Sequence, residues 1–156
     1  MVTLMSATEQ DDAFLKQVYA STRTEELAAM GLDALGGQAF VDLQFKARRM
    51  DYQRRFPQAR WEIIHHQGQA AGYWCVDRGA DEFRLVDIAL LPACRAQRVG
   101  TDCVRALMEE ARAACLPLRL HVFSSNPARR LYERLGFVAS AAQGLFLPMQ
   151  WQPSGA

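Results

Sequence analysis

The order of the strand and helix patterns is the feature of this sequence that most constrains its fold. Two alternating apolar segments, 61–66 and 70–76, flank Gly68, which is typical of a β-hairpin. A third strand pattern over 83–90 follows, after which helix and strand patterns alternate. Neighbouring strands followed by such alternation predict an α+β fold, a mixed, mostly antiparallel sheet with helices on both faces.

Three helical patterns precede the hairpin. Apolar residues recur at helical spacing from Phe14 to Tyr19, a short helix fits 24–30, and a longer one fits 38–55. We expect this longer helix to bury a face made of Phe40, Leu43, Ala47 and Met50. Its basic residues are expected on a solvated face, which could also recruit an acidic substrate: Lys46, Arg48, Arg49, Arg54 and Arg55.

Composition and charge argue against several classes of protein. The 156 residues, 50 % hydrophobic and 22 % charged, suffice for one domain with its own core. The formal net charge is only +1, whereas nucleic-acid-binding domains usually carry a strong basic excess, so no nucleic-acid partner is expected. No apolar run reaches about 18 residues, so no membrane span is expected.

The cysteines and the first residues indicate a cytoplasmic protein. Cys75, Cys94, Cys103 and Cys115 form no C-x-x-C pair and match no zinc-site spacing. We therefore expect reduced thiols and no bound metal. The opening MVTLMSATEQDD lacks the basic start and the apolar stretch of a signal peptide.

The helix predicted after Asn126 has the clearest boundaries in the chain. Asparagine is a favoured N-cap residue and Pro127 suits the first helical position. Leu131 and Tyr132 lie on its apolar face, and Gly136 occupies the position where a left-handed residue ends a helix.

A basic loop joins the strand at 83–90 to the helix predicted over 99–114. Helix N-termini offer unpaired N–H groups and the positive end of the helix dipole, which together favour anions. Arg95 and Arg98 add positive charge beside the expected start of the helix. These features are consistent with an anion site of pyrophosphate size, or with a solvated connection between strand and helix.

Two motifs in these segments resemble the GNAT superfamily of acyl-CoA-dependent N-acetyltransferases. The family's cofactor loop, Arg/Gln-x-x-Gly-x-Gly/Ala, falls on residues 95–100. Its C-terminal motif, Leu-Tyr-x-x-Leu-Gly-Phe, falls on residues 131–137. Both motifs stand in the family's order, with one helix and one strand predicted between them.

The chain departs from the family pattern at two places. Arg98 replaces the first glycine of the loop, where it could donate a charge-assisted hydrogen bond to the pyrophosphate or crowd the site. The family commonly places an asparagine seven residues before the tyrosine; here Ser125 holds that place and Asn126 follows it. Either residue is a candidate to face the pantetheine arm.

The resemblance implies one acetyltransferase domain over residues 1–156, with acceptor-side helices at about 1–56 and an acetyl-CoA-binding core at about 83–137. Acetyl-CoA is the implied co-substrate, the acceptor is a small-molecule or peptide amine, and no metal is required. Many members dimerise, which makes a homodimer compatible with the resemblance. The residues implied in cofactor binding are Ile88, Leu90, Arg95, Ala96, Gln97, Arg98, Val99, Gly100, Thr101, Tyr132 and one of Ser125 and Asn126.

The implied reaction is direct attack of a primary amine on the thioester, and it needs an acid and a base. Tyr132 matches the family's tyrosine that faces the cofactor sulfur, so it is the candidate acid. Packing alone is the other interpretation of this residue. A backbone N–H near Leu90 is the implied donor to the oxyanion.

Two residues are candidates for the base. Asp87 interrupts an apolar strand, and strict alternation places it on one face with Leu85 and Ala89. His121 lies on the strand where some relatives carry a catalytic carboxylate, although counting back from Tyr132 places Leu120 there instead. Structural roles are the alternatives for both candidates.

A binding module is the rival to the enzyme. In this second hypothesis the GNAT fold holds acyl-CoA, or only a partner, without catalysis. Arg98 in place of glycine favours the module, whereas Tyr132 together with Asp87 or His121 favours the enzyme.

Overall fold

The computed structural model describes residues 2–95 and 97–154, and its elements follow the predicted order. The strands are β1 (Val2–Ser6), β2 (Arg60–His66), β3 (Gln69–Arg78), β4 (Phe83–Leu90), β5 (Leu118–Phe123), β6 (Val138–Ala139) and β7 (Phe146–Trp151). The helices are α1 (Asp12–Ser21), α2 (Thr24–Met30), α3 (Ala34–Arg55), α4 (Val99–Ala114) and α5 (Ala128–Arg134). Two short 3-10 turns, η1 (Glu9–Asp11) and η2 (Pro92–Cys94), complete the order.

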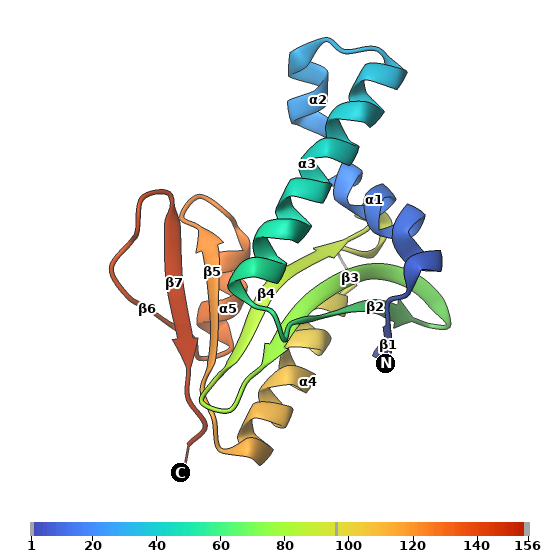
Figure 1. The fold of residues 1–156 in the computed structure, drawn as a ribbon. Helices are drawn as coiled ribbons and strands as arrows, with labels where there is room; N and C mark the ends of the chain where they lie inside the picture. The colour runs from blue at the N-terminus through green and yellow to red at the C-terminus, as the bar shows by residue number, and fades with distance from the viewer. Residues whose placement is uncertain (1, 96, 155–156) are drawn as a thin grey trace.

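The strands form one sheet in the order β1-β2-β3-β4-β5-β7-β6 (Figure 1). Among the described strands, β4 and β5 are the only parallel neighbours, and α4 makes the crossover between them. The predicted α+β fold with a mixed, mostly antiparallel sheet is therefore confirmed.

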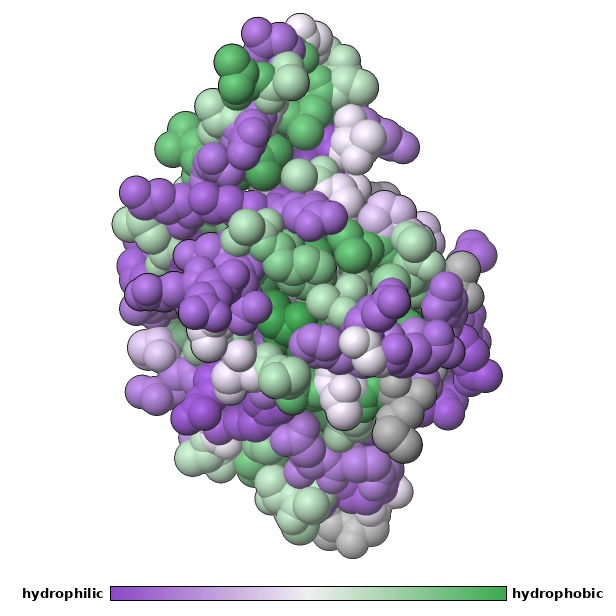
Figure 2. All heavy atoms as spheres, turned by 90° about the vertical axis from the view of Figure 1, so that its right-hand side faces the viewer, coloured by the Kyte–Doolittle hydropathy of each residue, from purple (hydrophilic) through white to green (hydrophobic). Residues whose placement is uncertain are grey.

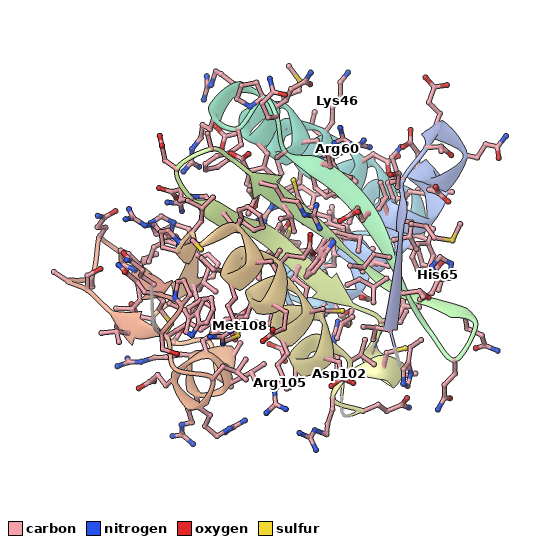
Figure 3. All side chains as sticks on the ribbon, turned by 90° about the horizontal axis from the view of Figure 1, so that it is seen from below. Lys46, Arg60, His65, Asp102, Arg105 and Met108 are labelled. Atoms are coloured by element: carbon pink, nitrogen blue, oxygen red, sulfur yellow. The ribbon has the colours of Figure 1, made fainter. Side chains whose placement is uncertain are left out.

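Helices cover both faces of the sheet. Seen from below in Figure 3, α3 and α4 lie on opposite faces, and Lys46 and Arg105 point away from the sheet in opposite directions. The larger core lies under α4, whose predicted apolar stripe, including Leu107, is buried. A smaller core, including Tyr19 and Phe45, lies between the sheet and the helices α1 and α3.

The buried face of α3 differs from the predicted one. Phe45 is buried, and the half-buried Arg48 and Tyr52 continue the same face at helical spacing. Leu43 and Met50, which were predicted to be buried, are 71 % and 62 % exposed. The prediction counted only apolar residues, whereas the inward face of this helix includes an arginine.

A bulge at Val86 changes which side chains of β4 share a face. The pairing with β3 skips this residue, because Cys75 lies opposite Asp87 and Val76 lies opposite Leu85. One extra residue reverses the facing of the strand beyond it. Leu85 therefore packs in the core under α4 while Asp87 faces α3, so the predicted common face of these two residues is wrong.

Strands β4 and β5 separate soon after they begin. Their ladder joins only Phe83–Leu85 to Leu118–Leu120. Within the described residues, the second half of β4 has no strand beside it on that side. The sheet is therefore split at this point, and a ligand could approach the free backbone of β4 there.

One part of the surface is an apolar projection. Helix α2 and the N-terminal end of α3 extend away from the sheet (Figure 1). Figure 2 shows hydrophobic side chains on this projection, where Met30, Leu32 and Leu35 are exposed. None of the described helices is both long enough and apolar enough to cross a membrane.

Candidate active site

Two cavities meet beside the split in the sheet. The α4 cavity, about 700 Å³, is lined by the N-terminal end of α4, by α5 and by the end of β4. The α3 cavity, about 610 Å³, is lined by α1, α3, β4 and β5. Both have a volume typical of small-molecule sites. The residues that line both cavities are Thr22, Ile88, Ala89, Asn126 and Tyr132.

Backbone N–H groups at the start of α4 face the α4 cavity. Among the residues of the first turn, Gly100 and Thr101 line the cavity and Val99 is buried beneath them. The N–H of Asp102 donates to the carbonyl of Arg98 at 3.0 Å, which begins the helical hydrogen bonding. The N–H groups before Asp102 have no partner inside the helix, so they and the helix dipole can serve an anion.

Arg98 adopts the backbone conformation that glycine favours. Its φ of 62° and ψ of 14° lie in the left-handed region, immediately before α4. For a residue with a Cβ atom this conformation costs about 1–2 kcal/mol. The loop thus keeps a glycine-type turn, and Arg98 lines the same cavity as Gly100 and Thr101.

The other predicted loop residues differ in where they point. Arg95 lines the α4 cavity, but its Nε donates to the carbonyl of Leu90 at 3.0 Å and its Nη2 donates to Ser21 Oγ at 3.2 Å. It therefore braces the loop against β4 and α1. The side chain of Gln97 donates back to the loop backbone and lines neither cavity. Ala96 lies outside the described residues.

The structure separates the two candidates at the start of α5. Asn126 lines both cavities, whereas Ser125 lines neither. Asn126 Oδ1 accepts a hydrogen bond from the N–H of Ala128 at 2.9 Å, and the N-cap position falls on Pro127, one residue later than predicted. Gly136, with a φ of 104°, ends this region in the left-handed conformation.

Tyr132 lies in the wall between the two cavities. Its ring packs edge-on against Phe137 at 5.6 Å and is 7 % exposed. Burial, and to a smaller extent the charge of Asp87, raises the pKa of Tyr132 to about 12. The phenol therefore keeps its proton at neutral pH, which an acid requires.

Asp87 faces the α3 cavity and is poorly solvated. Its side chain is 16 % exposed, and Arg48 Nη1 lies 3.8 Å from Oδ2. Among the described residues this buried Oδ2 has no hydrogen-bond partner. Burial raises the pKa of Asp87 above its ordinary value, against the opposing effect of Arg48. A carboxylate in this setting is a stronger base than one in water.

His121 lines the same cavity, but its free lone pair is already engaged. Arg84 Nη1 donates to His121 Nδ1 at 2.9 Å, since a guanidinium group can only donate. A neutral imidazole in this arrangement carries its proton on Nε2, and the lone pair on Nδ1 accepts from Arg84. Burial and the nearby charges of Arg84 and Arg55 lower the pKa of His121.

Arg48 is the residue of the α3 cavity whose place the sequence did not predict. Arg48 was placed on a solvated face of α3, yet its side chain is only 29 % exposed and reaches Asp87. Tyr19 and Tyr52 flank it, with its guanidinium carbon 5.2 Å and 6.0 Å from their ring centroids. The i, i+3, i+7 spacing of Phe45, Arg48 and Tyr52 was the available signal.

No metal centre is found in the part of the chain that the structure describes. In residues 2–95 and 97–154, no three side chains of His, Cys, Asp or Glu gather where they could hold a metal ion.

Comparison with known proteins establishes the family. The model of the acetyltransferase (GNAT) family matches residues 18–137, so the chain belongs to this family. A Bacillus subtilis (strain 168) protein, a candidate [ribosomal protein bS18]-alanine N-acetyltransferase, is 32 % identical over 83 residues. That match covers 51 % of this chain and 54 % of the other, so this chain spans about half the length of that curated relative.

Solved structures share the fold over nearly the whole chain. The PaiA N-acetyltransferase from Thermoplasma acidophilum, in complex with coenzyme A, gives a TM-score of 0.72 at 13 % identity, covering 97 % of this chain and 99 % of that one. The ribosomal-protein-S18-alanine N-acetyltransferase from Escherichia coli gives a TM-score of 0.62 at 20 % identity. That match covers 100 % of this chain and 96 % of the other. At these identities the likeness establishes the fold. Fold and family together define the class, the acetyltransferase (GNAT) family.

Proposed function

We propose that the protein transfers an acetyl group from acetyl-CoA to the primary amine of a small-molecule or peptide acceptor by direct attack. The position of Tyr132 is the observation that carries this proposal. Its buried ring stands where the α4 cavity meets the α3 cavity, so one hydroxyl group can serve both. Family membership supplies the class of reaction.

The α4 cavity fits the cofactor. The free N–H groups at the start of α4 and the guanidinium group of Arg98 suit a pyrophosphate. Ile88 and Leu90 line the same cavity on the part of β4 that pairs with no described strand towards β5, where pantetheine amides could add as a strand does. Asn126 rather than Ser125 is our candidate to contact that arm.

In this mechanism the base, Asp87, lies in the α3 cavity, and the acid, Tyr132, lies where the two cavities meet. Acetyl-CoA supplies the acetyl group as an activated thioester. Asp87 takes a proton from the amine in the α3 cavity, directly or through water, because the nucleophile is the neutral amine. Tyr132 donates its phenolic proton to the departing thiolate sulfur. We assign the base to Asp87 rather than His121, because Arg84 engages the lone pair of the histidine. None of these steps needs a metal.

The acceptor and the surroundings of the enzyme are further parts of the proposal. Relatives are named for an alanine of ribosomal protein S18, which makes a peptide amine one acceptor to test. A cytoplasmic location agrees with four free cysteines, because the thiols stay reduced there.

The substitution Tyr132→Phe tests the proposal. We expect kcat to fall about tenfold or more, because the acid is lost while the ring is kept. Stabilisation by acetyl-CoA in thermal unfolding should stay close to that of the wild type. An unchanged kcat would remove Tyr132 from the mechanism. If the wild type binds acetyl-CoA and consumes no thioester with a broad amine panel, the binding module replaces the enzyme.

A further inference from the structure

The α3 cavity is rich in arginine at the end where α3 meets β4. Arg55, Phe56, Arg84 and His121 line this end, which we call the arginine corner, and Asp51, the ion-pair partner of Arg55, lines the same cavity. None of these residues has a role in the acid and base steps above. The corner is therefore available for a contact with the acceptor outside the reacting groups.

Within the described residues, the arginines in and around the corner outnumber the carboxylates that pair with them. On the β4 side, Glu82 is shared by Arg84 and Arg119, with an N–O distance of 3.5 Å to each. On the α3 side, Asp51 is shared by Arg54 at 2.8 Å and Arg55 at 3.3 Å. Two carboxylates thus serve four guanidinium groups, which leaves a net positive charge.

The guanidinium groups of Arg55 and Arg84 both lie over the ring of Phe56. The guanidinium carbon of Arg55 lies 5.2 Å from the ring centroid, and that of Arg84 lies 5.5 Å from it. An aromatic ring orients a guanidinium group that lies over it, and a guanidinium group has five N–H donors. Arg84 Nη1 already donates to His121 Nδ1 and Arg55 Nη1 donates to Asp51 Oδ2, so an anion would bind to the remaining N–H donors of this oriented pair.

The titration of the corner agrees with this excess of positive charge. Burial lowers the pKa of Arg84, and Arg119 and Arg55 add to that effect despite Glu82. Burial also lowers the pKa of His121, with Arg84 and Arg55 as further causes. Both groups are thus protonated less readily than in water. A bound anion would favour their charged forms and raise both pKa values again.

The corner lies within reach of Asp87. Arg84 and Asp87 are three residues apart on β4 and both line the α3 cavity. Three residues of extended chain span at most about 10 Å. An acceptor with its amine at Asp87 could therefore place a second group at the corner if several bonds separate the two.

We propose that the acceptor is a small amine that also carries a carboxylate or a phosphate, with the anion bound by Arg55 and Arg84 and the amine held at Asp87. This inference rests on the proposed transferase function. The arginines act on specificity, by contact with a part of the acceptor that does not react.

A panel of amines matched in length tests the inference. The probes are hexylamine, aminocaproate, aminohexyl phosphate and hexamethylenediamine, with acetyl-CoA consumption as the readout. We expect kcat/KM for the two anionic amines to exceed that for hexylamine by about 10- to 100-fold, the range of a charge-assisted contact. Hexamethylenediamine should react most slowly. The ratio of aminocaproate to aminohexyl phosphate then tells a carboxylate acceptor from a phosphate acceptor.

Variants of the corner test whether Arg84 and Arg55 cause the preference for anionic amines. Arg84→Gln should bring the anionic amines to within about threefold of hexylamine, with kcat for hexylamine unchanged. Arg55→Gln should do the same in part, and because this side chain is 52 % exposed the variant should fold normally. Arg54→Gln is the matched control, since Arg54 pairs with the same Asp51, is 79 % exposed and does not line the cavity.

The outcomes separate the inference from the proposed function. Equal rates for all amines, or a preference that survives Arg84→Gln and Arg55→Gln, would overturn the anionic acceptor and leave the transferase intact. Reaction of hexylamine or the diamine without reaction of the anionic amines would do so too. No acetylation of any amine would overturn both.

Discussion

The two cavities that meet at Tyr132 are built in different ways. The α4 cavity depends on backbone: the N–H groups at the start of α4 and the free edge of β4. The α3 cavity depends on side chains that α1, α3, β4 and β5 bring together, including Arg48 and Asp87. A backbone-built site tolerates changes of side chain, whereas a side-chain-built site can acquire a new specificity through single substitutions.

The largest effect is expected on the α3 side, from Asp87→Asn. We expect kcat/KM at pH 7 to fall about 100-fold or more, because a general base contributes that much. The acidic limb of the pH–rate profile should disappear with it. Wild-type rates in Asp87→Asn would contradict this assignment, because Asp87 would then have no chemical role in the α3 cavity.

The stability of the same variant gives an internal control. The pKa of Asp87 is raised in the folded protein, so this group favours folding below its unfolded pKa and loses that contribution as the pH rises through its folded pKa. Asparagine cannot ionise and avoids that loss. We therefore expect Asp87→Asn to unfold at pH 7 at a Tm no lower than that of the wild type. A large fall in Tm would point to a structural aspartate.

His121→Ala sharpens the assignment of the base within the same cavity. We expect kcat with hexylamine, which lacks an anionic group, to change by less than about tenfold, because the histidine accepts from Arg84 and has no lone pair to offer. The pH–rate profile measured beside that of Asp87→Asn checks this. Loss of the acidic limb in His121→Ala alone would transfer the role of base to the histidine.

Gly72→Ala tests the backbone on which both cavities depend. A Cβ atom at this position would lie 2.2 Å from the carbonyl oxygen of Ala89, so β3 and β4 would have to move apart. We expect the free energy of unfolding to fall by about 1–3 kcal/mol, measured by urea denaturation. Gly37→Ala on α3 is the control: its nearest neighbour would be Leu27 Cδ2 at 3.9 Å, and a small gain in stability is expected.

The smallest effect is expected at the loop of the α4 cavity. Arg98→Gly should stabilise the protein by about 1 kcal/mol, because it removes the cost of a Cβ atom at a φ of 62°. Arg98→Ala removes the same charge and keeps that cost, so the difference between the two variants isolates the backbone. Acetyl-CoA affinity should change by less than about tenfold in both. A much larger loss would show that the guanidinium group, not the backbone, binds the cofactor.

The sequence predicted the elements around the α4 cavity well. The ends and apolar stripes of α4 and α5 are local patterns: Gly136 and the stripe of α4 lie as predicted, and α5 begins one residue later than predicted. The bulge at Val86 was not predicted, because it depends on the pairing of β3 with β4 and leaves no mark in strict alternation. Arg48 was misplaced because an arginine on an inward face looks like a solvated charge until its partner, Asp87, is known.

Thermal unfolding of the wild-type protein with and without acetyl-CoA tests the central claim most directly. That claim is that the backbone at the start of α4 holds the cofactor although Arg98 replaces a glycine. At about 100 times Kd, binding should add about 2.7 kcal/mol to the free energy of unfolding. For a chain of this size, Tm should rise by about 5–10 °C. No shift at millimolar acetyl-CoA would contradict the account, because the α4 cavity would then not be a cofactor site.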